Sequence, residues 1–324
     1  MSSQQQSLTM SAQAASNSRI PKRLHLYVLC FASLALTSAF AGYEVSRFAG
    51  AGGANSGSVE AATLPLPSPD AASSAFVDLS NLAPQDQARQ LLDRAIQRDL
   101  RSLDLIAKNV DLWRGHLVDE GPLFNSVHKA LNADDLGVRA AALEIDLAAN
   151  NLSKTPETVA ALVKKLHTDP ANRPWTLWRL GALGNRGVET NLVFAQLSTY
   201  AHDSNEETRY WAVEGLAMLG TDATINPLLD SFAHDRSARV RQRAACNLAE
   251  SGMLTHEQRL AAVPQLLNFF DDDAMNPATR GWVYGALRTI TGVQLGNDAN
   301  AWRQWWAKRD TTTKHHRRTA MLYA

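Results

Sequence analysis

Small and apolar residues recur at helical spacing along the C-terminal three quarters of the chain, and acidic residues interrupt them at regular distances. In the clearest unit, residues 203–220 (DSNEETRYWAVEGLAMLG), an aspartate comes first, an arginine follows, and a small, apolar helix ends at glycine. Similar segments begin at Asp135, Asp169, Asp235 and Asp273, and the successive spacings of the five aspartates are 34, 34, 32 and 38 residues. This period predicts stacked two-helix units that bury a shared core.

Each of these segments is predicted to form the second helix of a pair. Apolar periodicity places the first helices at about 122–131, 156–167, 188–201, 223–233 and 257–270. Two of them carry start signals. Thr155 and Pro156 suit the N-cap and first helical position, and Thr255 with Gln258 forms a capping-box sequence.

Both ends of the repeat array carry different patterns. Residues 84–117 show one amphipathic period, which predicts a single N-terminal capping helix within a segment 84–120. The repeats then occupy 121–309. Near their end, Trp302, Trp305 and Trp306 fall on one helix face, so we expect a Trp-rich helix that closes the core. Residues 310–324 are polar and basic, which predicts a disordered tail.

The N-terminal region is organised around one uninterrupted apolar stretch, residues 24–43. Twenty helical residues span about 30 Å, the hydrocarbon thickness of a bilayer. The stretch follows a polar tail (1–23) that ends in basic residues, so the positive-inside rule predicts a cytoplasmic N-terminus and an extracytoplasmic repeat domain. Ala39-Phe40-Ala41 is also a cleavage-site pattern, so the alternative is a signal peptide cut at Ala41 and a secreted or periplasmic product. Residues 44–83, rich in Gly, Ser and Pro, are predicted to form a tether.

The second-helix segments resemble HEAT repeats, in particular the short bacterial kind known from phycobilisome-lyase-like proteins. The pattern D-x-x-x-x-V-R-x-x-A is matched by Asp235, Val240, Arg241 and Ala244. In the preceding copy, Thr208, Arg209 and Ala212 match it with Thr in place of Val. The resemblance covers about residues 121–309. It implies an all-α fold, a right-handed α-solenoid of about five helix pairs, and a binding rather than catalytic role.

In HEAT repeats, the aspartate and arginine of one unit align with those of the next and form a series of charge-assisted hydrogen bonds. The resemblance therefore implies scaffold roles for Asp203 with Arg209, for Asp235 with Arg241, and for Asp273 with Arg280. We call this series the arginine ladder.

Composition and motifs argue against several other functions. The 32 Lys and Arg balance the 32 Asp and Glu, so no basic footprint indicates nucleic acid. Cys30 and Cys246 lie in different predicted regions and predict no disulfide within the repeats. His167, His202 and His234 precede the aspartates, but they occupy equivalent positions of successive repeats, too far apart for one metal. No catalytic motif occurs, so we expect neither an enzyme nor a cofactor.

Aromatic residues suggest where a partner binds. Tryptophan follows the repeat arginine by two residues in three copies, at Trp175, Trp211 and Trp282, and Arg243 has this position in a fourth. Because second helices line the concave surface of HEAT stacks, these residues, with Trp178 and Tyr210 beside them, are candidates for a partner-binding groove. The alternative is that the tryptophans pack between repeats.

Two classes of function remain open. The first is a membrane-tethered scaffold that binds an unknown protein partner through the groove. The second is an envelope enzyme or carrier that binds a small ligand there, such as a glycan or a lyase-type chromophore. A long open groove with Trp and Arg anchors favours the first, and a closed pocket with convergent polar groups favours the second.

Overall fold

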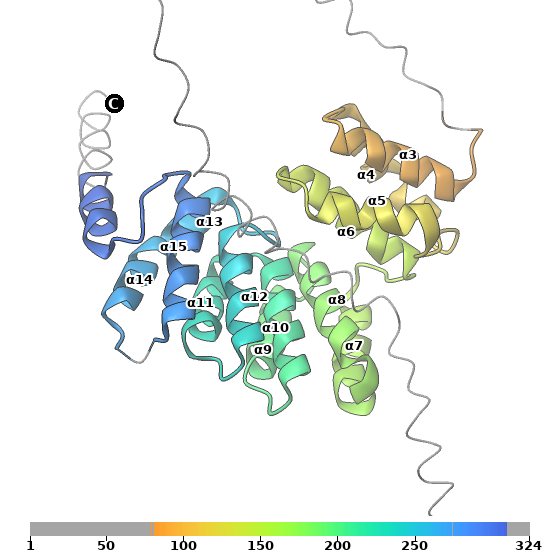
Figure 1. The fold of residues 1–324 in the computed structure, drawn as a ribbon. Helices are drawn as coiled ribbons and strands as arrows, with labels where there is room; N and C mark the ends of the chain where they lie inside the picture. Colours follow the sequence, from red (N-terminus) through yellow and green to blue (C-terminus); the bar gives the residue numbers. More distant parts are fainter. Residues whose placement is uncertain (1–78, 80, 274, 310–324) are drawn as a thin grey trace, which may run out of the picture. The chain divides into compact units, whose positions relative to one another are not determined.

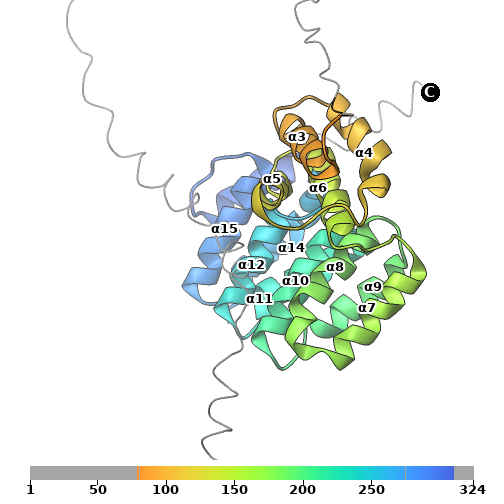
Figure 2. The same ribbon diagram turned by 90° about the vertical axis from the view of Figure 1, so that its right-hand side faces the viewer.

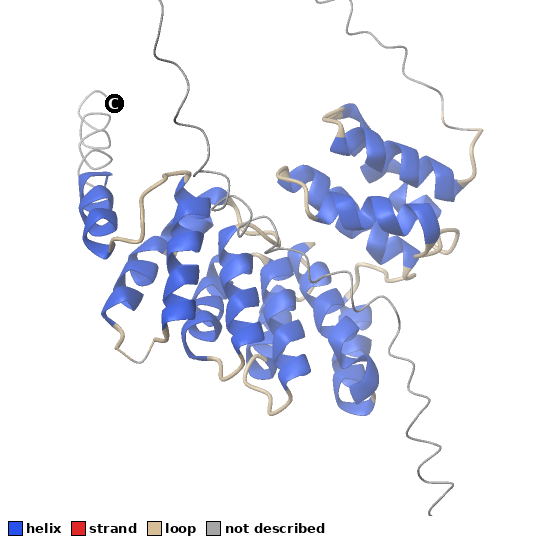
Figure 3. Ribbon diagram, viewed as in Figure 1, coloured by secondary structure: helices blue, strands red, loops and turns tan. Residues whose placement is uncertain are grey.

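The computed structural model describes residues 79, 81–273 and 275–309, and within these ranges all regular elements are helical (Figure 3). The first four helices are α3 (Pro84–Ile96), α4 (Arg101–Trp113), α5 (Gly121–Leu131) and α6 (Leu136–Ala149). They form two antiparallel pairs that pack on each other through α3–α5 and α4–α6 contacts. The shared core contains fully buried Leu92, Ile106, Leu123 and Ile145.

Four further helix pairs follow. They are α7 (Pro156–Thr168) with α8 (Arg173–Asn185), α9 (Thr190–Tyr200) with α10 (Glu206–Leu219), α11 (Ile225–His234) with α12 (Ala238–Ala249), and the short α13 (His256–Ala261) and α14 (Val263–Asn268) with α15 (Pro277–Thr291). Short 3₁₀ turns, Pro170–Asn172, Asp222–Thr224 and Phe269–Asp271, lie between some of them. The second helices α8, α10, α12 and α15 lie side by side in this order (Figures 1 and 2).

Among the second helices, α10, α12 and α15 begin at side-chain caps, whereas α8 does not. Asn205, Ser237 and Asn276 accept hydrogen bonds from backbone N–H groups in the first turn of α10, α12 and α15, respectively. Asp135 does the same for α6, through the N–H groups of Gly137 and Val138. These caps satisfy donors that the helix itself leaves unpaired, which explains why polar residues recur at this point of each repeat.

Two glycines allow the closest approach between second helices. A β-carbon added to Gly181 of α8 would lie 2.2 Å from the carbonyl oxygen of Gly215, and one added to Gly215 of α10 would lie 2.7 Å from the carbonyl oxygen of Leu177. The two backbones are therefore in direct contact, and only glycine fits at either position. This contact explains why α8 and α10 form the most extensive helix pair.

The helix α10 is buried around its whole circumference, since every residue from Thr208 to Leu219 is buried. A helix that is buried on all sides lies at the centre of a core rather than at its edge. It contacts α8, α9, α11 and α12. Residues 203–220, the clearest unit of the sequence pattern, therefore lie at the centre of the repeat stack.

The structure corrects two predicted helices. The predicted capping helix 84–117 is two helices, because Arg98 adopts a left-handed conformation (φ 70°) and the Asp99 N–H donates to the Arg94 carbonyl, which ends α3 in a Schellman turn. The predicted helix 257–270 is divided into α13 and α14. Pro264 stands at the start of α14, where its ring and missing N–H prevent a continuous helix.

A final helix over residues 299–309 carries the three clustered tryptophans. Trp302 is fully buried and its indole N–H donates to the Gly296 carbonyl at 3.0 Å. Trp305 packs edge-on against Trp302, with ring centroids 5.9 Å apart, and Trp306 neighbours Trp305. Arg303 also bonds Asp271 of the last repeat at 2.6 Å, through an exposed ion pair.

The other predictions for the chain ends fall outside the described residues. These are the polar tail 1–23, the apolar stretch 24–43 with its cleavage pattern, Cys30, nearly all of the tether 44–83, and the tail 310–324. Among the helices that the structure describes, none has the length and apolar character needed to cross a membrane.

Candidate functional site

The repeat arginines set the position of the second helices. Each arginine donates to backbone carbonyls just before its own helix: Arg139 to Ala133, Arg173 to Leu166, Arg209 to Asp203 and Ser204, Arg241 to Asp235, and Arg280 to Asp272 and Met275. These charged donors satisfy turn carbonyls that have no helical partner. The arginine thus fixes the turn between the two helices of its repeat.

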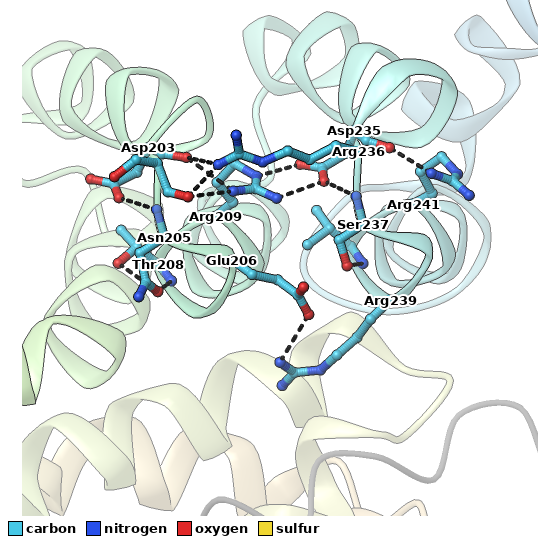
Figure 4. A network of polar contacts seen from close by, with 12 residues as sticks. Asp203, Asn205, Glu206, Thr208, Arg209, Asp235, Arg236, Ser237, Arg239 and Arg241 are labelled. Atoms are coloured by element: carbon cyan, nitrogen blue, oxygen red, sulfur yellow. Dashed lines mark hydrogen bonds and ion pairs between the residues drawn. The ribbon is translucent and has the colours of Figure 1, made fainter.

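Arg209 of the arginine ladder also joins two repeats, through the carboxylate of Asp235. Arg209 donates from Nε to Asp235 Oδ2 at 2.8 Å and from Nη2 to Oδ1 at 3.0 Å (Figure 4). The two side chains are only 5% and 4% exposed. Asp235 in turn accepts the Ser237 N–H at 2.7 Å, at the start of α12. The Asp235 carboxylate, through its hydrogen bonds, raises the pKa of Arg209. This ion pair connects α10 to the start of α12.

The expected ladder pairs are therefore corrected in their chemistry. Arg209 uses the backbone of Asp203 and the carboxylate of the next repeat, and Arg241 uses the backbone of Asp235 and the hydroxyl of Thr279 at 3.2 Å. Arg280 bonds the carbonyls of Asp272 and Met275 rather than Asp273.

Arg139 departs further from the series. Its Nη1 donates at 2.7 Å to the carbonyls of both Glu250 and Gly252, in the loop after α12. Arg259 donates to the same loop, at the carbonyl of Ser251, and its burial, followed by the nearby Arg139 charge, lowers its pKa to about 10. Two buried arginines thus hold this loop. The hydrogen bonds of Arg139 connect α6 to a repeat more than 100 residues away in sequence.

Most of the aromatic residues predicted to line a partner-binding groove are packed among the second helices. The rings of Trp175 and Trp211 lie 5.3 Å apart between α8 and α10, and Trp211 is 1% exposed. The Trp211 indole N–H donates to Glu207 at 2.8 Å. Trp178, also 1% exposed, lies in the core. Of the two alternatives for these rings, the structure favours packing between repeats.

Arg243 is part of a buried polar network with two residues that the sequence analysis did not single out. Its guanidinium pairs with both carboxylate oxygens of Glu214, from Nη2 to Oε2 at 2.8 Å, across α10 and α12. Asn247 donates to the same carboxylate at 3.2 Å and to the Val213 carbonyl at 3.3 Å. A glutamate in the middle of an apolar helix was the available signal, since a buried carboxylate requires a charged or hydrogen-bonding partner.

Tyr210 lies beside this network under the guanidinium of Arg239, whose central carbon is 4.0 Å from the ring centroid. Arg239 also bonds Glu207. Burial, and secondarily the Glu214 charge, raise the pKa of Tyr210 to about 12. The tyrosine is therefore neutral near pH 7 and acts as a platform for a partly exposed cation.

The exposure predicted for a groove is thus wrong for Trp178, Tyr210, Trp211 and Arg243, all of which are buried. The physical reason is the close contact of α8 with α10 and the ion pair between α10 and α12, which enclose these side chains. Trp175 and Trp282 are half-buried and retain accessible ring surface. Partner binding by these two tryptophans stays a prediction.

His167 and His234 lie in the last turns of the first helices α7 and α11. His167 Nδ1 lies 3.4 Å from the Tyr200 hydroxyl, and His234 Nδ1 lies 3.0 Å from Asp230 within the same helix. Within the described ranges, no group of three or more His, Cys, Asp or Glu side chains is arranged to hold a metal ion.

Comparison with known proteins agrees with this architecture. Residues 159–249, from α7 to the end of α12, match the family model described as HEAT repeats. The match and the all-helical described part support a HEAT-repeat protein with an α-solenoid architecture. The curated proteins contain no match to this chain.

Proposed function

We propose that this protein is a HEAT-repeat scaffold that binds a protein partner through the second helices α8, α10, α12 and α15, and that residues 24–43 attach it to a membrane. HEAT repeats commonly mediate protein–protein interaction, and the match over residues 159–249 is the observation that carries the proposal. The arginine ladder and the Glu214–Arg243 pair give these helices a fixed register, which lets them present a preorganised surface.

The partner-binding residues that we propose are those with accessible surface on these helices. Trp175 and Trp282 offer half-buried rings, and Arg239, whose side chain is 42% exposed, lies over Tyr210. Partly exposed Trp and Arg side chains dominate the binding energy of many protein interfaces. Buried Trp211 packs against Trp175, and buried Tyr210 lies under the Arg239 guanidinium.

The topology that we propose places the N-terminus in the cytoplasm and the repeats outside it, with release by cleavage at Ala41 as the alternative. It rests on basic residues before twenty apolar ones. A reporter that is active only outside the cytoplasm, fused after Tyr43, is expected to be active. Activity of a cytoplasmic reporter at that point would overturn the topology, and a mature N-terminus at Gly42 would establish the released form.

The partner site is tested by photo-crosslinking in the full chain. A photoreactive residue at position 282 of α15 is expected to give a discrete crosslinked protein, whereas the same residue at exposed position 164 of α7 is not. Equal labelling at both positions, or no protein product from positions 175 and 282, would contradict a site on the second helices.

The finer resemblance to phycobilisome-lyase-like repeats motivates the second candidate, a carrier or enzyme that takes a small ligand. A closed pocket lined by the tryptophans would favour it. The cavity between α4 and α6 and the open depression that adjoins it are lined by other residues, so we rank the protein scaffold first.

A further inference from the structure

A small apolar cavity lies between α4 and α6. Its volume is about 210 Å³, and its apolar walls come from Leu103, Ile106, Ala107 and Val110 of α4 and from Gly137, Ala140 and Ala141 of α6. Three charged residues, Glu144, Lys154 and Arg186, complete the lining. The same three residues line a wider, open depression of about 580 Å³, together with Asn185, Gly187 and Val188. The depression and the cavity therefore share these three charged residues, which we call the charged rim.

The small residues on α6 create the apolar part. Gly137, Ala140, Ala141 and Glu144 are spaced by three or four residues, so they share one helix face. A β-carbon on Gly137 would lie 3.2 Å from the Leu103 side chain, which shows how closely α4 approaches at this end of the cavity.

The charged rim has two cations and one carboxylate. The carboxylate lies within hydrogen-bond distance of only one of the two cations. Lys154 Nζ lies 2.8 Å from Glu144 Oε2, whereas Arg186 Nη1 lies 3.7 Å from Glu144 Oε1, which is longer than a hydrogen bond. The nearest other carboxylate, Asp111, is 4.0 Å from Lys154 Nζ and is paired with Arg114 at 2.7 Å. The residues that line the two cavities thus have a net charge of +1.

The Arg186 guanidinium has further unused donor capacity. It donates to the Asn185 side chain from Nη2, and its buried Nε makes no hydrogen bond within the described part of the chain. An arginine side chain has five N–H donors in a planar arrangement that suits a carboxylate. The side chain is 22% exposed, so an anion in the depression can reach its terminal Nη atoms, although not the buried Nε.

We propose that this site binds the C-terminal end of a partner polypeptide, with the last apolar side chain in the cavity and the α-carboxylate on Arg186 and Lys154. The volume suits one side chain rather than a drug-sized molecule, for which pockets of about 300–1,000 Å³ are typical. The open depression accommodates the preceding backbone. This inference rests on the proposed scaffold role, to which it adds a second partner site on α4 and α6, apart from the surface of the second helices.

The test uses the purified full-length chain and a fluorescent peptide, Gly-Ser-Gly-Ser-Leu, with a free C-terminal carboxylate. We expect saturable binding by fluorescence anisotropy, and binding about tenfold or more weaker for the same peptide with a C-terminal amide, since the charge-assisted hydrogen bonds are lost. Acetyl-leucine should compete only at much higher concentration. Equal affinity for acid and amide would overturn the carboxylate assignment, and acetyl-leucine as potent as the peptide would assign the site to a small carboxylic acid instead.

Variants locate the binding. Arg186→Gln should weaken peptide binding about tenfold or more, because it removes the cation that faces the carboxylate. Ala140→Leu should abolish binding by filling the cavity. Lys164→Gln, which removes an exposed lysine of α7, is the matched control and should bind normally. Circular dichroism verifies that each variant is folded. If both site variants bind like the wild-type chain, the cavity is not the site.

This result is separable from the proposed function. Loss of the peptide site with crosslinking intact at position 282 would overturn only the inference for the α4–α6 cavity. Peptide binding without any protein crosslink on the second helices would overturn the proposed partner surface and leave the cavity site standing.

Discussion

Arg209 and Asp235 form a two-point ion pair between successive repeats, with N–O distances of 2.8 and 3.0 Å and both side chains almost completely buried. The aspartate lies directly before α12 and the arginine in the first turn of α10, so the pair links the helix entries of adjacent units (Figure 4). Since Arg209 also donates to its own turn, one side chain fixes both the fold of its repeat and the position of the next.

Removing one partner of this pair should strongly destabilise the protein. Arg209→Ala leaves the Asp235 carboxylate buried without its cation, and such changes cost about 3–5 kcal/mol. Arg303→Ala, which breaks the exposed pair with Asp271, is the control and should cost about 0–1 kcal/mol. Urea unfolding of the full chain measures both. Equal effects of the two substitutions would show that the buried ion pair does not form.

The glycine contact between α8 and α10 gives a second prediction. Gly181→Ala places a methyl group against the Gly215 carbonyl and should destabilise the stack by about 1–3 kcal/mol, because the helices must separate. Gly281→Ala in α15 is the matched control. Nothing lies within 4 Å of its added β-carbon, so the substitution should be neutral or stabilise by about 0.5–1 kcal/mol. The midpoints of thermal unfolding separate the two outcomes.

The tryptophans should divide by burial. Trp211→Ala removes a ring that packs on Trp175 and should cost about 3–5 kcal/mol of folding free energy. Trp282→Ala removes a half-buried ring and should cost clearly less while it weakens partner crosslinking from neighbouring positions. A Trp211 variant that unfolds at the wild-type urea concentration would refute the packing role.

Alkaline titration reports on Tyr210. Its pKa in the folded chain is about 12, above the ordinary value of 10.0, so the folded state keeps a proton that the unfolded state loses. This contribution to stability is complete below pH 10 and is lost as the pH rises to about 12. The Tyr210→Phe variant should therefore lose less stability over this interval than the wild-type chain. The ultraviolet difference spectrum between the wild-type chain and the Tyr210→Phe variant isolates the tyrosinate signal of Tyr210, which should be centred near pH 12. A signal centred near pH 10 would contradict the buried environment.

The pattern of aspartate, arginine and small apolar residues was enough to predict the helical pairs, because periodicity and capping act over a few neighbouring residues. Thr255 and Gln258 do form the expected capping box. The same local logic could not divide residues 84–117, where the amphipathic period continues through Arg98 although the backbone turns there. The apolar spacing also predicted one continuous helix for α13 and α14, although Pro264 interrupts it.

The sequence by itself determined which residues recur, and so which helices pair and where arginine meets a turn. Only the tertiary structure decided what each recurring residue contacts. Arg209 finds a carboxylate in the next repeat, Arg280 finds backbone carbonyls, and Arg139 reaches a loop more than 100 residues away. Trp211 and Arg243 likewise became buried because the Gly181–Gly215 contact and the Glu214 carboxylate draw neighbouring helices together. Such partners come from other repeats, and no periodicity within one helix specifies the distance between two.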